Sequence, residues 1–248
     1  MKRSLRWLVL GFVVLGIAGL SVGPAAGSAD KAKIGKAEDY DPTIDPADFA
    51  GFPIDNQYLP MVPGTTFFYE MKTGDGLETD EVYITHQTKP ILGVTCVVVL
   101  DTVKLEGVLI ELTYDWYAQD KDGNVWYFGE DSTQYEGGVP VGTAGSWEAG
   151  VDGARPGIVM LADPRPGESY RQEYQAGVAE DMASVLRLNA VVEVPYGSFP
   201  DCLETKEWSP LETGAVEQKF YAPGVGNVLV VEHHGKAVRQ ELVNVTTD

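Results

Sequence analysis

Two stretches of this chain, about a hundred residues apart, have a similar order of residues. Five short matches occur in sequence: Pro63–Phe67 with Pro166–Tyr170, Glu70 with Glu173, Cys96 with Cys202, Tyr117–Ala118 with Tyr221–Ala222, and Gly123–Val125 with Gly226–Val228. Their offsets are 103, 103, 106, 104 and 103 residues. Matches in one order at nearly one offset indicate an internal duplication. A duplicated unit strongly constrains the architecture, but it says little about the chemistry.

Both copies contain short segments whose apolar and polar residues alternate, separated by turn residues. Residues 80–85 alternate, and residues 108–117 place Ile110, Leu112, Tyr114 and Trp116 on one face. The turn at residues 120–124 is typical of a hairpin. The sequence therefore predicts a mainly β, antiparallel fold, in which two duplicated meander copies form a curved sheet, a sandwich or an open barrel.

The duplication also bears on one ambiguous segment. Residues 178–186 have the composition of a helix, but the offset aligns them with residues 77–83, which alternate as a strand does. We therefore predict a strand over residues 182–188. Residues 237–245 are expected to close the fold as the last strand.

The N-terminal residues are typical of a secretory signal peptide. Lys2, Arg3 and Arg6 precede an apolar run over residues 7–22, and small residues at 27–29 offer a cleavage site. This predicts a secreted, periplasmic or cell-surface protein without a membrane span after cleavage. With no cysteine near the cleavage site, a lipoprotein anchor is not expected.

The remaining chain is expected to hold one domain. We predict a signal peptide over residues 1–29, an acidic, proline-containing linker over 30–58, and a single β domain over 59–248. Within that domain, copy one spans 59–136, a glycine-rich insertion spans 137–165 and copy two spans 166–248. The insertion is either a crossover strap that brings the copies together or a long functional loop.

The charge of the exported chain is strongly negative. Cleavage removes three of the 18 basic residues and none of the 37 acidic ones, which leaves a formal net charge of −22. Such a charge repels nucleic acid and anionic membranes. It is typical of a solvated acidic surface or of adaptation to salt, and it also makes loosely bound calcium possible.

The two cysteines occupy matching places in the copies. Export would place them in an oxidising compartment, and equivalent residues near a pseudo-twofold axis approach one another. We predict a Cys96–Cys202 disulfide, with two buried free thiols as the alternative.

A candidate calcium site lies in the turn that contains Asp120, Asp122 and Asn124. Its spacing departs from that of an EF-hand loop, and its flanks are aromatic strands instead of helices. A hairpin turn explains the same residues without a metal. No other cofactor is expected, because the chain has no metal-binding histidine motif, nucleophile elbow, phosphate loop or dinucleotide fingerprint.

Aromatic residues concentrate around the same hairpin. They are typical of cross-strand pairing, or of a stacking platform for a sugar or an apolar ligand. Together with the nearby insertion they give a candidate ligand-binding set of Trp116, Trp126, Tyr127, Trp147, Glu148 and Asp152.

Several turn and strand segments resemble a group of exported bacterial and archaeal β-sheet proteins of uncharacterised function. These segments are residues 114–120, 123–127, 194–199 and the YAPGVG hairpin at 221–226. The Pro-x-Gly-x-Phe turn and the YAPGVG hairpin are also similar to those of curved-sheet periplasmic lipoproteins and lipid carriers. The resemblance implies a fold and no particular activity.

Binding is favoured over catalysis. The leading hypothesis is a non-catalytic exported protein that binds an extracellular partner or an amphipathic or apolar ligand at the aromatic hairpin and glycine-rich insertion. The alternatives are a carboxylate-based enzyme that acts on polysaccharides, and a structural protein of the envelope or an appendage.

Overall fold

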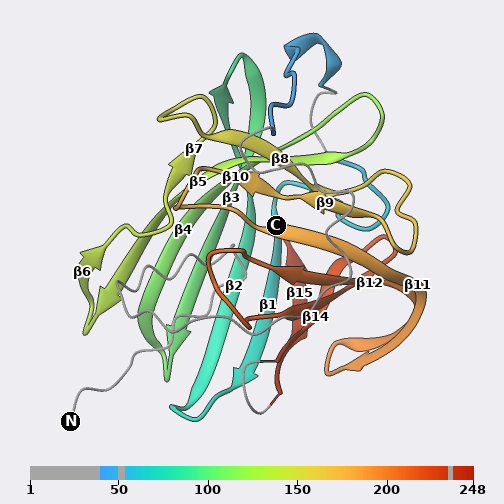
Figure 1. Cartoon of the computed structure of the whole chain (residues 1–248). Helices are drawn as coiled ribbons and strands as arrows, with labels where there is room; N and C mark the ends of the chain where they lie inside the picture. Colours follow the sequence, from blue (N-terminus) through green and yellow to red (C-terminus); the bar gives the residue numbers. More distant parts are fainter. Residues whose placement is uncertain (1–39, 50–53, 234–236) are drawn as a thin grey trace, which may run out of the picture.

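The protein is a single antiparallel sheet that curves until it is nearly closed on itself (Figure 1). The computed structural model describes residues 40–49, 54–233 and 237–248. The predicted antiparallel β class and the curved form of the sheet are thereby confirmed. Within the described residues the only helical element is the short 3-10 turn η2 (Pro46–Asp48). The strands are β1 (Thr65–Lys72), β2 (Leu77–Ile91), β3 (Val94–Leu105), β4 (Val108–Gln119), β5 (Val125–Glu136), β6 (Val139–Gly142), β7 (Trp147–Glu148), β8 (Arg155–Met160), β9 (Ser169–Arg171), β10 (Glu173–Tyr174), β11 (Met182–Val194), β12 (Gly197–Trp208), β13 (Glu217–Ala222), β14 (Gly226–Glu232) and β15 (Val238–Thr247).

Strands β1 to β5 form a meander in which each strand pairs with the next one along the chain. The turn between β2 and β3 is Leu92–Gly93, with φ of 50° and 82°, and the turn between β3 and β4 is Glu106–Gly107, with φ of 51° and 78°. Two-residue turns with positive φ at both positions match the right-handed twist of the flanking strands. Glycine at the second position therefore favours tight hairpins here.

Strands β11 to β14 form a second meander, and β15 joins the two. β15 pairs with β14 on one side and with β1 on the other. The segment predicted as the last strand is confirmed by β15. The strand predicted over residues 182–188 is also confirmed, since it lies within β11.

The two predicted copies begin with the same local geometry. The Gly64 N–H donates to the Ile84 carbonyl at 2.8 Å, and the Gly167 N–H donates to the Val185 carbonyl at 2.9 Å. Both glycines have positive φ, 85° and 89°. The common origin of the two copies stays a prediction.

The insertion over residues 137–165 continues the sheet. Strands β6, β7 and β8 all pair with β5, and β8 also pairs with β10. The expectation of a long loop or strap is therefore wrong for this segment. Its strands are two to six residues long, and short strands between glycines leave little periodicity in the sequence.

Part of the predicted linker packs against the sheet. Ile54 is buried and forms a β-bridge with Met61, while Phe49 forms one with Asp120. The Tyr40 hydroxyl donates to the Pro156 carbonyl at 2.9 Å. The predicted domain boundaries stay predictions, and the predicted signal peptide lies outside the described residues.

The predicted disulfide is not formed in the structure. Cys96 and Cys202 are both free and buried, and they lie in two different hydrophobic clusters. The Cys96 cluster contains Trp116 and Tyr127, whereas the Cys202 cluster contains Phe220 and Leu242. The matched positions in the sequence therefore do not bring the two thiols together.

Candidate functional site

Part of the inner face of the first meander is polar and acidic. Asp101 of β3 lies directly opposite Thr113 of β4, Thr113 lies opposite Ser132 of β5, and Asp115 lies opposite Glu130. Residues directly opposite one another on adjacent strands point to the same face. The resulting row of buried carboxyl, hydroxyl and amide groups, here called the acidic row, comprises Glu78, Asp80, Asp101, Glu111, Thr113, Asp115, Glu130, Ser132 and Gln134.

Asp80 and Asp101 form a hydrogen-bonded pair of carboxyl groups within the acidic row. Gln240 Nε2 donates to Asp80 Oδ2 at 2.9 Å, but Oδ1 of each aspartate is buried without a hydrogen-bond partner. Burial raises the pKa of Asp80 to about 7. Burial and the charge of Asp80 raise the pKa of Asp101 well above its usual range. A hydrogen bond between two carboxyl groups needs a proton, so the pair retains one near neutral pH.

A second proton is held between Asp115 and Glu130. The Tyr127 hydroxyl lies 2.5 Å from Asp115 Oδ1 and 2.8 Å from Glu130 Oε2. A phenol has one proton to donate, so one of the two contacts requires a protonated carboxyl group. Burial raises the pKa of both Asp115 and Glu130, and nearby carboxylates raise each further.

The opposite wall carries a buried cation. Lys219 Nζ of β13 lies 2.9 Å from Glu207 Oε2 of β12 and 3.8 Å from Glu217 Oε2. The Tyr221 hydroxyl donates to Glu207 Oε1 at 3.2 Å. Burial acts to lower the pKa of Lys219, but the charges of Glu207 and Glu217 outweigh burial and raise it. Lys219 therefore stays positively charged.

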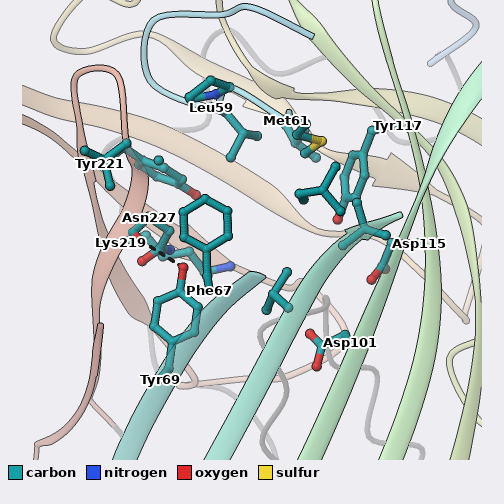
Figure 2. A pocket seen from close by; sticks show the side chains of 17 residues that line it. Leu59, Met61, Phe67, Tyr69, Asp101, Asp115, Tyr117, Lys219, Tyr221 and Asn227 are labelled. Carbon is teal, nitrogen blue, oxygen red and sulfur yellow. Dashed lines mark hydrogen bonds between the residues drawn. The ribbon is translucent and has the colours of Figure 1, made fainter. Parts of the chain in front are cut away.

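A partly open cavity of about 110 Å³ lies between these two walls. Figure 2 shows Asp101 and Asp115 on neighbouring strands at one side, with Tyr69, Lys219 and Tyr221 on the other. The remaining lining is mainly apolar and comes largely from β1, β2, β3, β8, the segment 59–61 and the turn between β13 and β14. Its apolar side chains are Leu59, Met61, Phe67, Val82, Ile84, Val99, Val159 and Val225. An apolar cavity with a few polar groups is the usual form of a small-molecule site.

Three of the predicted ligand-binding aromatics pack inside the protein instead of forming an exposed platform. Trp116, Tyr127 and Trp147 are all buried. Tyr127 stacks on Tyr117 at 4.9 Å between ring centroids and meets the Trp147 ring edge-on at 5.4 Å. Lys89 Nζ lies 3.2 Å from the Trp116 ring centroid. Tyr117 and Tyr127 are direct cross-strand partners, which confirms the pairing alternative.

Of the other three predicted ligand-binding residues, Glu148 shares Lys89 with Trp116, whereas Trp126 and Asp152 have other surroundings. Trp126 Nε1 donates to Asp120 Oδ2 at 2.8 Å. Glu148 forms an ion pair with Lys89 at 2.7 Å, and Asp152 lies exposed in a turn with φ of 49°. Ligand binding by this set stays a prediction.

The residues of the predicted calcium site form a hydrogen-bonded turn. Asp120 Oδ1 accepts the backbone N–H groups of Asp122 and Asn124, both at 2.9 Å. Asp120 Oδ2 accepts from Asn124 Nδ2 and Trp126 Nε1. Four donors therefore already occupy the carboxylate that a calcium ion would need. Across the described ranges, no group of three or more histidine, cysteine, aspartate or glutamate residues could hold a metal ion.

The polar residues that line the cavity are not among the site residues predicted from the sequence. Asp101, Asp115 and Lys219 each lie within a strand, and each has at least one apolar or aromatic neighbour in the sequence. A signal was present, since Glu78 and Asp80 stand two positions apart and polar residues occupy every second position of 111–115. Alternation of this kind usually indicates a solvent-facing side, whereas here it marks the interior.

The comparisons with known proteins found only a weak likeness to two solved structures. No protein-family model matches the chain, and the curated proteins contain no match. A solved structure from Bacteroides fragilis, described as a candidate exported protein with a YmcC-like fold, is 17% identical with a TM-score of 0.46; the match covers 77% of this chain and 100% of that one. A candidate lipoprotein from Parabacteroides distasonis is 11% identical with a TM-score of 0.39, and the match covers 77% and 99%. Neither likeness carries information about activity.

No helix in the described part of the chain has the length and apolar character needed to cross a bilayer.

Proposed function

We propose that this is an exported, non-catalytic protein that holds a small amphipathic molecule inside its curved sheet. One observation carries the proposal: the cavity is walled mainly by apolar side chains, but Asp101 and Asp115 give it a polar end. An apolar body would replace water against the walls, while a polar group would meet the carboxyl groups. The inner cavity thus takes the place of the aromatic hairpin as the proposed site.

The size of the cavity supports a small ligand over a polysaccharide. Apolar cavities of about 150 Å³ hold molecules the size of benzene, and this one is about 110 Å³. A glycan chain would need an open groove lined by exposed side chains. The carboxyl groups of Asp101 and Asp115 are instead almost completely buried. Binding is therefore the better supported of the two hypotheses.

Native mass spectrometry of the protein purified from its host tests this proposal. We expect a retained small molecule on the wild-type protein. A Val99→Phe variant, which adds bulk to the cavity wall, should lose that molecule. Val108→Phe, which adds the same bulk at a half-exposed position of β4, should keep it. Equal retention by the two variants would argue against the cavity as the site.

A further inference from the structure

We infer that the ligand is an amphipathic amine, whose ammonium group lies between the carboxyl groups of Asp101 and Asp115 while its apolar part lies against Ile84, Val99 and Phe67. The inference rests on the proposed function and names the chemical class of the ligand.

The first support is a buried acceptor without a partner, on a residue that lines the cavity. Asp101 is only 3% exposed, it lines the cavity, and its Oδ1 has no hydrogen-bond partner. Leaving a buried carboxyl oxygen without a donor is costly. Asp115, on the neighbouring strand, faces the same space (Figure 2). A donor placed between the two side chains would satisfy Asp101 and would meet two carboxyl groups at once.

The second support is the balance of charge around Asp101. The titratable groups that face it are Glu78 and Asp80 of β2, Glu111 and Asp115 of β4, Tyr69 of β1 and, across the cavity, Lys219 of β13. Lys219 is the one cation among them, and it is paired with Glu207 and Glu217 on the opposite wall. A ligand that brings a positive charge is therefore favoured over one that brings a negative charge.

An organic cation fits this space better than a metal ion. The carboxyl groups of the acidic row are spread along neighbouring strands, and no three acidic, histidine or cysteine side chains among the described residues converge as metal ligands. The apolar walls have no oxygen to offer a bare cation, whereas they suit a hydrocarbon chain.

Binding of an ammonium group would release a proton. The Asp80–Asp101 pair and the Asp115–Glu130 pair each hold a proton when the cavity has no cation in it. When the ammonium group enters, one carboxyl proton leaves to solvent, so the net charge of the site is unchanged. Affinity for the amine should therefore rise with pH until the amine itself loses its proton.

Isothermal titration calorimetry with three ligands of one chain length tests the inference: n-hexylamine, n-hexanol and hexanoate. We expect the amine to bind the wild-type protein most tightly, about tenfold or more above the alcohol. Affinity for the amine should increase between about pH 6 and about pH 8, and its heat should differ between buffers of different ionisation enthalpy because a proton is released.

Two variants locate the ammonium group. Asp101→Asn keeps the shape of the side chain but removes its charge, and it should weaken amine binding about tenfold or more while leaving n-hexanol unchanged. Asp131→Asn makes the same change at an exposed position of β5 and should alter neither the affinity for the amine nor that for n-hexanol. Circular dichroism of each variant verifies the fold.

The outcomes separate the two proposals. Tighter binding of n-hexanol or hexanoate than of the amine would overturn the amine assignment and leave the cavity as a binding site. Equal amine affinity of Asp101→Asn and the wild-type protein would also overturn the assignment. If none of the three ligands binds and no molecule is retained from the host, the proposed function fails as well.

Discussion

Replacing Asp80 with asparagine should make the protein more stable at neutral and alkaline pH. Asp80 is 2% exposed, and one of its oxygens has no partner. The asparagine carbonyl can still accept from Gln240, and its amide group can donate to Asp101. The substitution therefore keeps the shape and the existing hydrogen bond of Asp80, and it removes a buried group that becomes charged as the pH rises.

The size of this gain in stability follows from the pKa of the Asp80 carboxyl group in the folded and in the unfolded protein. Burial raises the pKa of Asp80 in the folded protein to about 7, against about 3.9 in an unfolded chain. The unfolded state loses its proton first, so the wild-type protein loses stability as the pH rises from about 4 through about 7, by up to about 4 kcal/mol for this group. Burial also raises the pKa of Glu78 and Glu111 to about 7, which adds to the loss.

Urea unfolding followed by tryptophan fluorescence at a series of pH values measures this effect. Asp80→Asn should match the wild-type protein near pH 4 and exceed it by up to about 4 kcal/mol near pH 8. Asp131→Asn, exposed on β5, should follow the wild-type curve throughout. Parallel curves for Asp80→Asn and the wild type, or a wild-type stability that increases with pH over this range, would refute the reasoning.

Three further predictions concern the packing of the sheet. Asp120→Ala removes the acceptor of four hydrogen bonds and should lower the free energy of unfolding by about 2 kcal/mol in urea. The urea midpoint of the wild-type protein should be the same with and without added calcium. A large increase with calcium would instead support the predicted metal site. Gly129→Ala places a Cβ 2.2 Å from the Trp147 carbonyl oxygen at a φ of 131°, so thermal unfolding should show a loss of stability of at least about 2 kcal/mol. The control Gly107→Ala places a Cβ with no atom within 4 Å and should lose less stability. Cys96 and Cys202 should resist a thiol reagent in the native protein and both react in denaturant; a single mass consistent with a disulfide would contradict this.

The sequence predicted the strands well, because alternation and turn residues are local signals. The hairpins at Leu92–Gly93 and Glu106–Gly107 follow from turn chemistry that neighbouring residues encode. For β11, composition alone favours a helix, and the strand was predicted only because the duplication aligns this segment with a strand of the first copy. The strands of the insertion were missed, since β7 has only two residues and depends on its partner β5.

The candidate site could not be predicted from the sequence, because alternation does not say which face is the interior. In β4, Leu112 and Tyr114 share one face and Thr113 and Asp115 the other. Hydrophobicity alone would bury the face with Leu112 and Tyr114. Closure of the sheet instead buries the face with Thr113 and Asp115. Which side is enclosed depends on curvature over many strands, and Lys219 approaches Asp101 only through that closure.

The place of β15 between β1 and β14 has a consequence for folding. Thr65 pairs with Thr247, so this contact closes a loop of nearly the whole described chain. Contacts between such distant residues form slowly, whereas the hairpins of each meander can form early. β15 directly follows β14 in the chain and can pair with it early, so the late contact is the one between β15 and β1. Until that contact forms, β1 and β15 each present an unpaired edge, and unpaired edges are where strands of different molecules associate. The step most exposed to aggregation is therefore the closure of the sheet between these two strands.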